Sequence, residues 1–572
     1  MLRAAALAAA LLSACALTAA DAGAVADRAA AARPASAVRA YASSQSIPPS
    51  GGIPGGSAAI SLNAASGEKE GAWIVASGAG SVSASVQNTA LGPLRVEVDF
   101  GHFVQFGRRL VPDALLPWNG AARAAEKPNQ PLYVRVTVPE GTAPGIYRGQ
   151  VAVGADGQTV AVPLSVRVHR VAVPAAGNPA GSMLTSFHIV PQTYLNKVDA
   201  MYRLGSNTER SQVNRALFPW LAGYRISPSS WGFGEPRSRG GYGGDSRWWL
   251  DSAGNMAGQM TNAKFSTMRV PISSNRQRSP IAGVSFAQPE QWCDYLRNVH
   301  SFWSSHGWLG GTIPYVYALD EPGLSGQRLV ARQAKATHAC FPAGRQLMTG
   351  NPSAANRFLW NGGSDDLDIW VVLLRRWYGR FTSPGHAANR ARENLGHIAA
   401  VRRRPGRMVW SYTYSAIAGT PGLRADRALS EPRMYLLWNA LEGTDGVLYG
   451  QGTTNYTTPN PLDRVDRGGE FVLFYPGRQT PIPSARLEQI RDGLEDAAIF
   501  NAVRAKRGAG AVRAILGDTG LFSANARGVR LACSLGCELR RGHAYAWPVW
   551  SNDGTTARKI EAAKLRALLA AS

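Results

Sequence analysis

The amino-acid sequence predicts an α/β protein in which a TIM-type (β/α)8 barrel is preceded by an all-β sandwich. Two residue patterns along the chain indicate this order. Short alternating apolar runs broken by Gly/Pro turns fill residues 66–173, and strand-like runs alternate with helix-like runs over residues 174–505. A doubly wound sheet is disfavoured because the sequence has no Gly-rich dinucleotide turn. With 572 residues, 45% of them hydrophobic, the chain can bury a large core.

The first residues are typical of an export signal, which we place at residues 1–20. Arg3 precedes an apolar run, and residues 12–15 (LSAC) resemble a bacterial lipobox, whose cysteine, here Cys15, would carry a lipid anchor to the membrane. A plain secretory signal is the alternative, and either segment is too short to span a membrane. We expect an exported bacterial protein in the periplasm, at the outer membrane as a lipoprotein, or outside the cell.

Residues 21–65 are rich in Ala, Ser, Pro and Gly and predict a flexible linker. Alternating runs such as residues 132–138 and 161–168 then predict the strands of the sandwich, at residues 66–173. After it, the barrel is expected at residues 174–505 and a C-terminal extension ending in a helix at residues 506–572.

Within the barrel region, apolar and β-branched runs predict strands, and longer runs between them predict helices. The predicted strands are residues 182–189, 315–319, 367–372, 407–412 and 444–448. The predicted helices are residues 289–302, 329–338, 387–399, 434–441 and 484–505.

Cysteine and histidine usage bears on disulfides and metals. If Cys15 carries the lipid, Cys293, Cys340, Cys533 and Cys537 remain, which allow three pairings; the close spacing makes Cys533 with Cys537 the first expectation. The nine histidines show no His-x-x-x-His or His-x-His spacing. We therefore expect neither a metal ion nor a cofactor.

The formal net charge of +23 comes mostly from arginine. Residues 402–407 include Arg402, Arg403, Arg404 and Arg407, and Arg375 and Arg376 form a second group. Such a field would attract an anionic polysaccharide or an anionic membrane surface, whereas the export signal disfavours nucleic acid. Arginine scattered over a solvated surface is an equally good interpretation. The sequence does not indicate an oligomeric state.

The candidate catalytic residues are Asp320 and Glu321, where the apolar run 312–319 stops on two adjacent acids. Barrel enzymes carry their reacting groups at the carboxyl ends of strands. Two neighbouring carboxyl groups do not both ionise as readily as one alone, so Glu321 could donate a proton while Asp320 stays anionic. Pro322 favours an extended backbone at Glu321. Ordinary loop acids are the alternative.

Four stretches of the chain together resemble glycoside hydrolase family 123, whose catalytic domain is also called domain of unknown function 4091. They are residues 112–117 (PDALLP), 139–147 (PEGTAPGIY), 317–322 (YALDEP), and 474–477 (FYPG) leading to 482–496. They follow the family's order over most of residues 97–500.

The resemblance implies a retaining β-N-acetylgalactosaminidase that acts on an oligo- or polysaccharide by substrate-assisted catalysis. It implies that Glu321 is the general acid/base and that Asp320 orients the 2-acetamido group. Adjacent strand residues point to opposite faces, which makes an acid and a protein nucleophile on either side of one bond difficult to place. If the acetamide oxygen of the sugar attacks, no protein nucleophile is required.

Aromatic and basic residues near the predicted strand ends are candidates for binding the sugar, since rings stack on the apolar faces of sugars. They are His188, Trp370, Trp377, Tyr378, Trp410, Tyr412, Tyr414, Arg433, Trp438 and Tyr449. Each ring could instead belong to the core. The family commonly has tryptophans at two places that here hold Gly450 and Tyr456, which puts the preferred sugar in doubt.

The charged residues Arg491, Asp492 and Glu495 are expected to be scaffold, bonded within or beside the last barrel helix. Two alternatives to the leading hypothesis remain. One is a glycosidase of the same fold with a different sugar specificity. The other is a non-catalytic surface protein that binds polysaccharide, for which Glu321→Gln would leave function intact.

Overall fold

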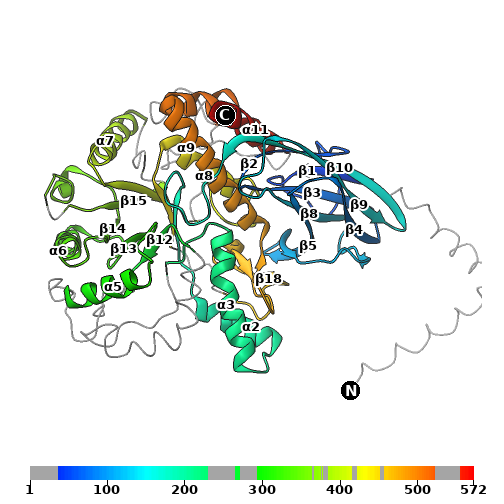
Figure 1. Cartoon of the computed structure of the whole chain (residues 1–572), viewed down its shortest axis with the longest axis horizontal. Helices are drawn as coiled ribbons and strands as arrows, with labels where there is room; N and C mark the ends of the chain where they lie inside the picture. Colours follow the sequence, from blue (N-terminus) through cyan, green and yellow to red (C-terminus); the bar gives the residue numbers. More distant parts are fainter. Residues whose placement is uncertain are drawn as a thin grey trace, which may run out of the picture.

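A computed structural model of the chain describes residues 37–229, 264–270, 293–363, 366–374, 377, 384–414, 421–450, 456–521 and 554–572, without the side chains of 88–89 and 384–392. Figure 1 shows two parts, with the parallel barrel strands on one side and the N-terminal strands on the other. Helices α8 (Glu431–Glu442) and α9 (Ala485–Asp518) run between them.

Two mixed sheets contain all the strands before residue 173. Their orders are β1-β3-β8-β5-β18, with β6 paired to β5, and β2-β10-β9-β4-β7. The strands are β1 Ala37–Ala42, β2 Ile60–Ser66, β3 Lys69–Ser77, β4 Ser81–Ala90, β5 Arg95–Phe106, β6 Arg109–Leu116, β7 Arg123–Ala124, β8 Asn129–Thr137, β9 Gly145–Ala155, β10 Gln158–Ala172 and β18 Arg464–Val465. Ile74 and Val134 of one sheet join Val153 and Val166 of the other in a common buried cluster.

The flexible linker expected at residues 21–65 is wrong from residue 37 onward, because β1 and β2 lie there. Strand β1 pairs antiparallel with β3, and β2 pairs parallel with β10. Their alanines and serines give little strand signal, since strand propensity comes mainly from β-branched and aromatic side chains. The pairing is stabilised by burial of small side chains, such as Ala40 and Ala64, against the other strands.

Seven parallel strands form the nearly closed barrel, in the order β11-β17-β16-β15-β14-β13-β12. They are β11 Leu184–Phe187, β12 Thr267–Arg269, β13 Ile313–Val316, β14 Arg345–Thr349, β15 Ile369–Leu373, β16 Met408–Tyr412 and β17 Gly446–Tyr449. Residues 226–229 lie in the remaining gap. There Ser229 N–H donates to Phe187 O at 2.7 Å, and Thr267 N–H donates to Ser227 Oγ at 3.3 Å.

Helices connect the barrel strands, and several short elements follow the last strand. The helices are α2 Pro191–Tyr202, α3 Asn207–Gly223, α5 Cys293–Ser305, α6 Leu324–Cys340, α7 Pro384–Arg402, α8, α9 and α11 Thr555–Ala571, with 3-10 turns η3 Ala354–Leu359 and η5 Arg467–Gly469. Strands β19 Phe474–Tyr475 and β20 Ile482–Pro483 form a small hairpin before α9. Helix α11 packs against α9, β2 and β10, so the C-terminal helix is part of the folded body.

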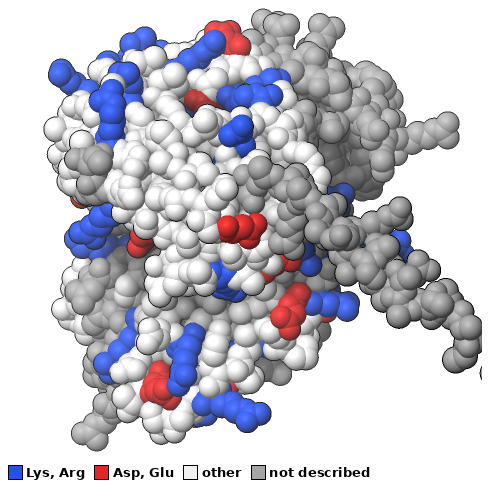
Figure 2. Space-filling model, turned by 90° about the vertical axis from the view of Figure 1, so that its right-hand side faces the viewer, with Lys and Arg blue, Asp and Glu red and all other residues white. Residues whose placement is uncertain are grey.

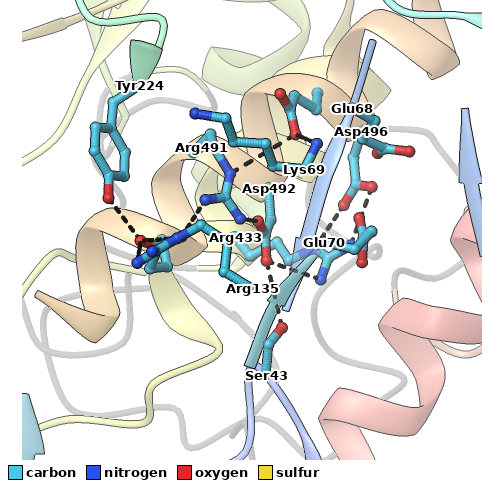
Figure 3. A network of polar contacts seen from close by, with 12 residues as sticks. Ser43, Glu68, Lys69, Glu70, Arg135, Tyr224, Arg433, Arg491, Asp492 and Asp496 are labelled. Carbon is cyan, nitrogen blue, oxygen red and sulfur yellow. Dashed lines mark hydrogen bonds and ion pairs between the residues drawn. The ribbon is translucent and has the colours of Figure 1, made fainter. Parts of the chain in front are cut away.

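A buried network of charged side chains joins the N-terminal sheets to α8 and α9. Arg135 of β8 donates to Glu488 of α9 at 2.6 Å, and Arg433 of α8 donates to Asp496 at 2.6 Å. Arg491 bonds Glu488 and Asp492 in the same network. Figure 3 shows these arginines and acids converging from strand and helix. The expectation that Arg491 and Asp492 belong to the scaffold is confirmed.

Among the described residues, one group of three acids is close enough to hold a metal ion: Glu68, Glu70 and Asp496. The ammonium of Lys564 from α11 occupies the middle of this group. Its Nζ lies 2.7 Å from Glu68 Oε1 and 3.9 Å from Asp496 Oδ1, and it also donates to Glu70. A cation of the chain itself therefore already occupies the place that a metal ion would take.

Cys293 and Cys340 form a disulfide that connects α5 to α6. With Cys293 and Cys340 bonded to each other, the expected pairing leaves Cys533 to bond Cys537. Both of those cysteines lie outside the described residues. In the part of the chain that the structure describes, we find no helix with the length and apolar character needed to cross a bilayer.

Arginines of the predicted basic group are largely engaged within the barrel. Arg402 donates to Glu442 O at 2.8 Å, and Arg407 pairs with buried Asp368. On the face shown in Figure 2, basic side chains lie in several separate places with acidic ones among them. The interpretation of arginine as scattered charge fits these positions better than a single patch does. Arg375 and Arg376 lie outside the described residues.

Candidate active site

A cavity of about 440 Å³ opens at the carboxyl ends of the barrel strands. Most of its lining residues are the last residue of a barrel strand or the first residue after one. They are His188, Ser229, Arg269, Tyr317, Asp320, Glu321, Thr349, Tyr412, Thr413, Tyr414, Leu448, Tyr449 and Gly450. This is the edge at which (β/α)8 barrels carry their reacting groups.

Asp320 and Glu321 both line this cavity and are both exposed. Strand β13 ends at Val316, and the next three residues are buried before the chain reaches the two acids. Glu321 has φ 41°, in the left-handed region, so the extended backbone expected before Pro322 is wrong. Because the chain has left the strand and turns here, the two side chains are not forced to opposite faces.

Two hydroxyl groups hold the carboxylate of Asp320. Tyr317 OH donates to Asp320 Oδ1 at 2.6 Å, and Thr349 Oγ1 donates to the same oxygen at 2.9 Å. Burial, together with the negative charge of Asp320, raises the pKa of Tyr317 well above its ordinary value. The phenol therefore stays protonated and remains a donor at neutral pH.

Glu321 is held at its backbone and at its carboxylate. Its N–H donates to Thr349 Oγ1 at 2.6 Å, and Tyr412 OH donates to its Oε1. Thr349 thus contacts both members of the pair, accepting from one residue and donating to the other. Tyr412 is the last residue of β16, so its hydroxyl is fixed by the barrel itself.

Arg269 and His188 also line the cavity. Arg269, the last residue of β12, donates to Tyr317 O at 2.9 Å, and its guanidinium lies 5.1 Å from the centre of the Tyr317 ring. Burial, and to a lesser degree the charge of Arg269, lowers the pKa of His188. His188 is therefore a neutral imidazole at neutral pH, able to donate and accept one hydrogen bond each.

Four of the predicted sugar-binding residues line the cavity: His188, Tyr412, Tyr414 and Tyr449. The hydroxyl of Tyr449 donates to Glu470 O at 2.7 Å. Gly450 also lines the cavity, whereas Tyr456 is buried and donates to Phe474 O at 3.1 Å. Tyr378 lies outside the described residues.

The predicted tryptophans do not reach the cavity. Trp370, Trp377 and Trp438 are fully buried in the core around the barrel, where the rings of Trp377 and Trp438 lie 5.1 Å apart. Trp370 precedes Val371, which points into the barrel, so the alternation of a strand directs the tryptophan outward. Trp410 is buried inside the barrel, 5.9 Å from Tyr315.

The prediction that Arg433 binds the sugar is also wrong, because Arg433 is completely buried in the charged network described above. The lining residues that the sequence analysis missed include Arg269, Tyr317 and Thr349. Tyr317 stands in the same apolar run as the two acids, so its spacing could have indicated it. Arg269 and Thr349 end β12 and β14, strands that the sequence analysis did not predict.

Comparison with known proteins gives an informative structural match. No protein-family model and no curated sequence matches the chain. A family 123 glycoside hydrolase from Clostridium perfringens, solved in a study of glycolipid glycan hydrolysis, superposes with a TM-score of 0.62 and 14% identity over 94% of this chain and 98% of that chain. The chain therefore has the fold of that enzyme, and the resemblance to family 123 is confirmed at the level of the fold.

Two further matching structures are much less similar. A GH10 xylanase with a bacterial Ig-like domain, from termite gut, gives a TM-score of 0.30 at 9% identity over 76% of this chain and 99% of that chain. An endo-β-1,4-mannanase from Thermotoga petrophila gives 0.31 at 12% identity over 56% of this chain and 77% of that chain. Both scores are too low to support an inference about this protein.

Proposed function

We propose that the protein is an exported glycoside hydrolase that cleaves β-linked N-acetylhexosaminides, with N-acetylgalactosaminides as the first candidates. The observation that carries this proposal is the adjacent pair Asp320 and Glu321, both facing one cavity at the carboxyl ends of the barrel strands. The fold shared with a family 123 enzyme supports it. The Cys293–Cys340 disulfide supports export, because disulfides persist in oxidising compartments.

In the proposed reaction the substrate supplies the nucleophile. Glu321 donates its proton to the glycosidic oxygen while the acetamide carbonyl oxygen attacks C1, so that the C1–O bond breaks as a cyclic oxazolinium forms. Asp320 accepts a hydrogen bond from the acetamide N–H and stabilises the positive charge of that intermediate. Water, deprotonated by Glu321, then opens the ring at C1 with overall retention of configuration.

Several other lining groups suit this chemistry. Tyr412 bonds the carboxylate of Glu321 and can keep it directed at the leaving oxygen. His188 and Tyr414 offer polar groups for sugar hydroxyls, and Gly450 leaves space at one wall. The two N-terminal sheets, which we interpret as a β-sandwich, are joined to the barrel through α9, which packs against β3, β6 and α8.

The test uses paired aryl β-glycosides that differ only at the 2-position, acetamido in one and hydroxyl in the other. The proposal predicts turnover of the acetamido substrate and at least 10²-fold slower turnover of the hydroxyl substrate, on the order expected when an intramolecular nucleophile is lost. A bicyclic thiazoline that mimics the oxazolinium should inhibit competitively. An active enzyme that cleaves both substrates equally and ignores the thiazoline would rule out substrate assistance.

A further inference from the structure

Thr349 is the residue on which the two candidate catalytic side chains depend for their positions. It is the last residue of β14, and its side chain is buried. Its hydroxyl uses both of its hydrogen-bonding roles on neighbouring residues. It donates to Asp320 Oδ1 at 2.9 Å and accepts from the N–H of Glu321 at 2.6 Å.

The second of these bonds acts on a strained backbone. Glu321 has φ 41°, and a residue with a side chain pays on the order of 1 kcal/mol or more to adopt that region. Such a conformation persists only where the surroundings fix it. The bond from the Glu321 N–H to Thr349 Oγ1 is a contact of this kind, because it ties the peptide between Asp320 and Glu321 to the end of a barrel strand.

The first bond acts together with Tyr317. Tyr317 OH and Thr349 Oγ1 reach the same oxygen of Asp320, at 2.6 Å and 2.9 Å. Together the two donors fix the orientation of the carboxylate that, in the proposed reaction, accepts a hydrogen bond from the acetamide N–H of the sugar.

We propose that Thr349 is a positioning residue that holds Asp320 and Glu321 facing the same cavity through its single hydroxyl. It acts through the two acids and does not itself touch the reacting atoms. The expected effect of Thr349 on kcat rests on the proposed function. The expected effect of Thr349 on the positions of Asp320 and Glu321 does not. Tyr317 has the narrower role: its hydroxyl bonds Asp320 and lies 3.3 Å from Thr349 Oγ1.

The experiment compares three variants of the full chain: Thr349→Val, Thr349→Ser and Tyr317→Phe. Valine keeps the shape of threonine and removes the hydroxyl, whereas serine keeps the hydroxyl. Water can reach the exposed Glu321, so the valine variant should fold, with a melting temperature within a few degrees of wild type.

For turnover of the acetamido substrate, kcat of Thr349→Val should fall on the order of 10²-fold, as expected for misplaced reacting groups, while KM changes little. Thr349→Ser should restore kcat to within about threefold of wild type, and Tyr317→Phe should lower it roughly 10-fold, because only one of the two donors to Asp320 is lost. Wild-type kcat in a folded Thr349→Val variant would overturn the inference. So would a serine variant as slow as the valine variant.

Crystal structures of the same variants separate this inference from the proposed function. In Thr349→Val, Glu321 should leave the left-handed region or its carboxylate should turn away from Tyr412, while in Thr349→Ser both should stay in place. If the wild type cleaves none of the substrates, the proposed function fails but this comparison still decides the inference. An unmoved pair in the valine variant would overturn it.

Discussion

Glu321 is the residue at which the structure departs most clearly from what its sequence neighbours suggest. A proline after a residue disfavours helical geometry there, which led to the expectation of an extended backbone. Glu321 instead has a left-handed φ, which is neither extended nor right-handed helical. The consequence is that two consecutive acids face one cavity, which no extended strand could achieve.

Replacing Glu321 by glutamine tests its role as the acid. Glutamine keeps the size and can still accept from Tyr412, but it cannot give up a proton. We expect kcat to fall on the order of 10²- to 10⁴-fold with little change in substrate binding, as measured by turnover of an aryl β-N-acetylhexosaminide and by calorimetric titration of the thiazoline.

Tyr456→Phe is a suitable control for that measurement, because Tyr456 is buried beyond the cavity and bonds only a backbone carbonyl among the contacts described. It should lower stability slightly and leave kcat unchanged. Retained turnover in Glu321→Gln would instead favour a surface protein that only binds polysaccharide.

At the scale of residues, sequence reasoning finds groups that stand together in the chain and misses groups that meet only in space. Asp320 and Glu321 are visible because they interrupt an apolar run. Thr349 and Arg269 belong to other strands, and nothing near them in the sequence marks them. The tryptophans were misplaced because a large ring near a strand end can point inward, outward or towards a helix, and only the strand register decides which.

Among the structural elements, the predicted strands are those with long apolar runs, such as β15 and β16. The sequence analysis did not predict strands β12 and β14. The first has three residues, and the second begins with Arg345 and Gln346, so neither shows a recognisable period. Strand β1 was assigned to a linker because its alanines are buried by partners far along the chain.

Lys564 on α11 provides a test at this scale. Its pKa is raised even though burial opposes this, because Glu68, Glu70 and Asp496 surround it. Lys564→Met would leave the buried carboxyl groups of Glu68 and Glu70 without the ammonium that contacts both of them. We expect a loss of about 3–5 kcal/mol in the free energy of unfolding, measured by denaturant titration.

Arg558→Met on the same helix is the matched control, because Arg558 is exposed and its side chain bonds only the neighbouring Thr555 among the contacts described. Its cost should be within about 0.5 kcal/mol. Equal stability of the two variants would show that the charged contacts of α11 contribute nothing.

Across the whole molecule, the barrel and the N-terminal sheets are held together by charge as well as by apolar contact. Composition and charge totals could not predict this, because a buried ion pair and two surface charges count the same in a sequence. Arg135 comes from β8 and Glu488 from α9, 353 residues apart in the chain. The sequence did indicate the scaffold role of residues 491–496, through their place on the last barrel helix.

This network predicts how stability depends on pH. Burial alone would raise the pKa of Glu488, but Arg135 and Arg491 outweigh it and lower the pKa to about 2, from an ordinary 4.5. A carboxyl with a lowered pKa in the folded state stabilises the protein above pH 4.5 and loses that contribution as the pH falls towards 2. The contribution is about 3 kcal/mol.

Thermal unfolding of wild type and of Glu488→Gln over a range of pH measures the contribution of Glu488 to stability. The advantage of the wild type should be constant near neutral pH and should shrink as the pH falls below about 4.5. Glu68 is the internal comparison: burial, the largest influence, outweighs Lys564 and raises its pKa to about 7. The difference in stability between wild type and Glu68→Gln should therefore change between about pH 4.5 and 7, and the wild type should become less stable relative to the variant as the pH rises. Identical windows for both variants would contradict these assignments.

The position of Lys564 also bears on how the chain acquires its structure during synthesis. Helix α11 follows every other described element, so it emerges from the ribosome after Glu68, after Glu70 of β3 and after Asp496 of α9. Until it arrives, Glu68 and Glu70 lack the ammonium that contacts both of them, whereas Asp496 already has Arg433. A chain that stops short of residue 564 would have to bury these two carboxyl groups without their cation or leave them hydrated, so the last described helix completes the junction between barrel and sheets.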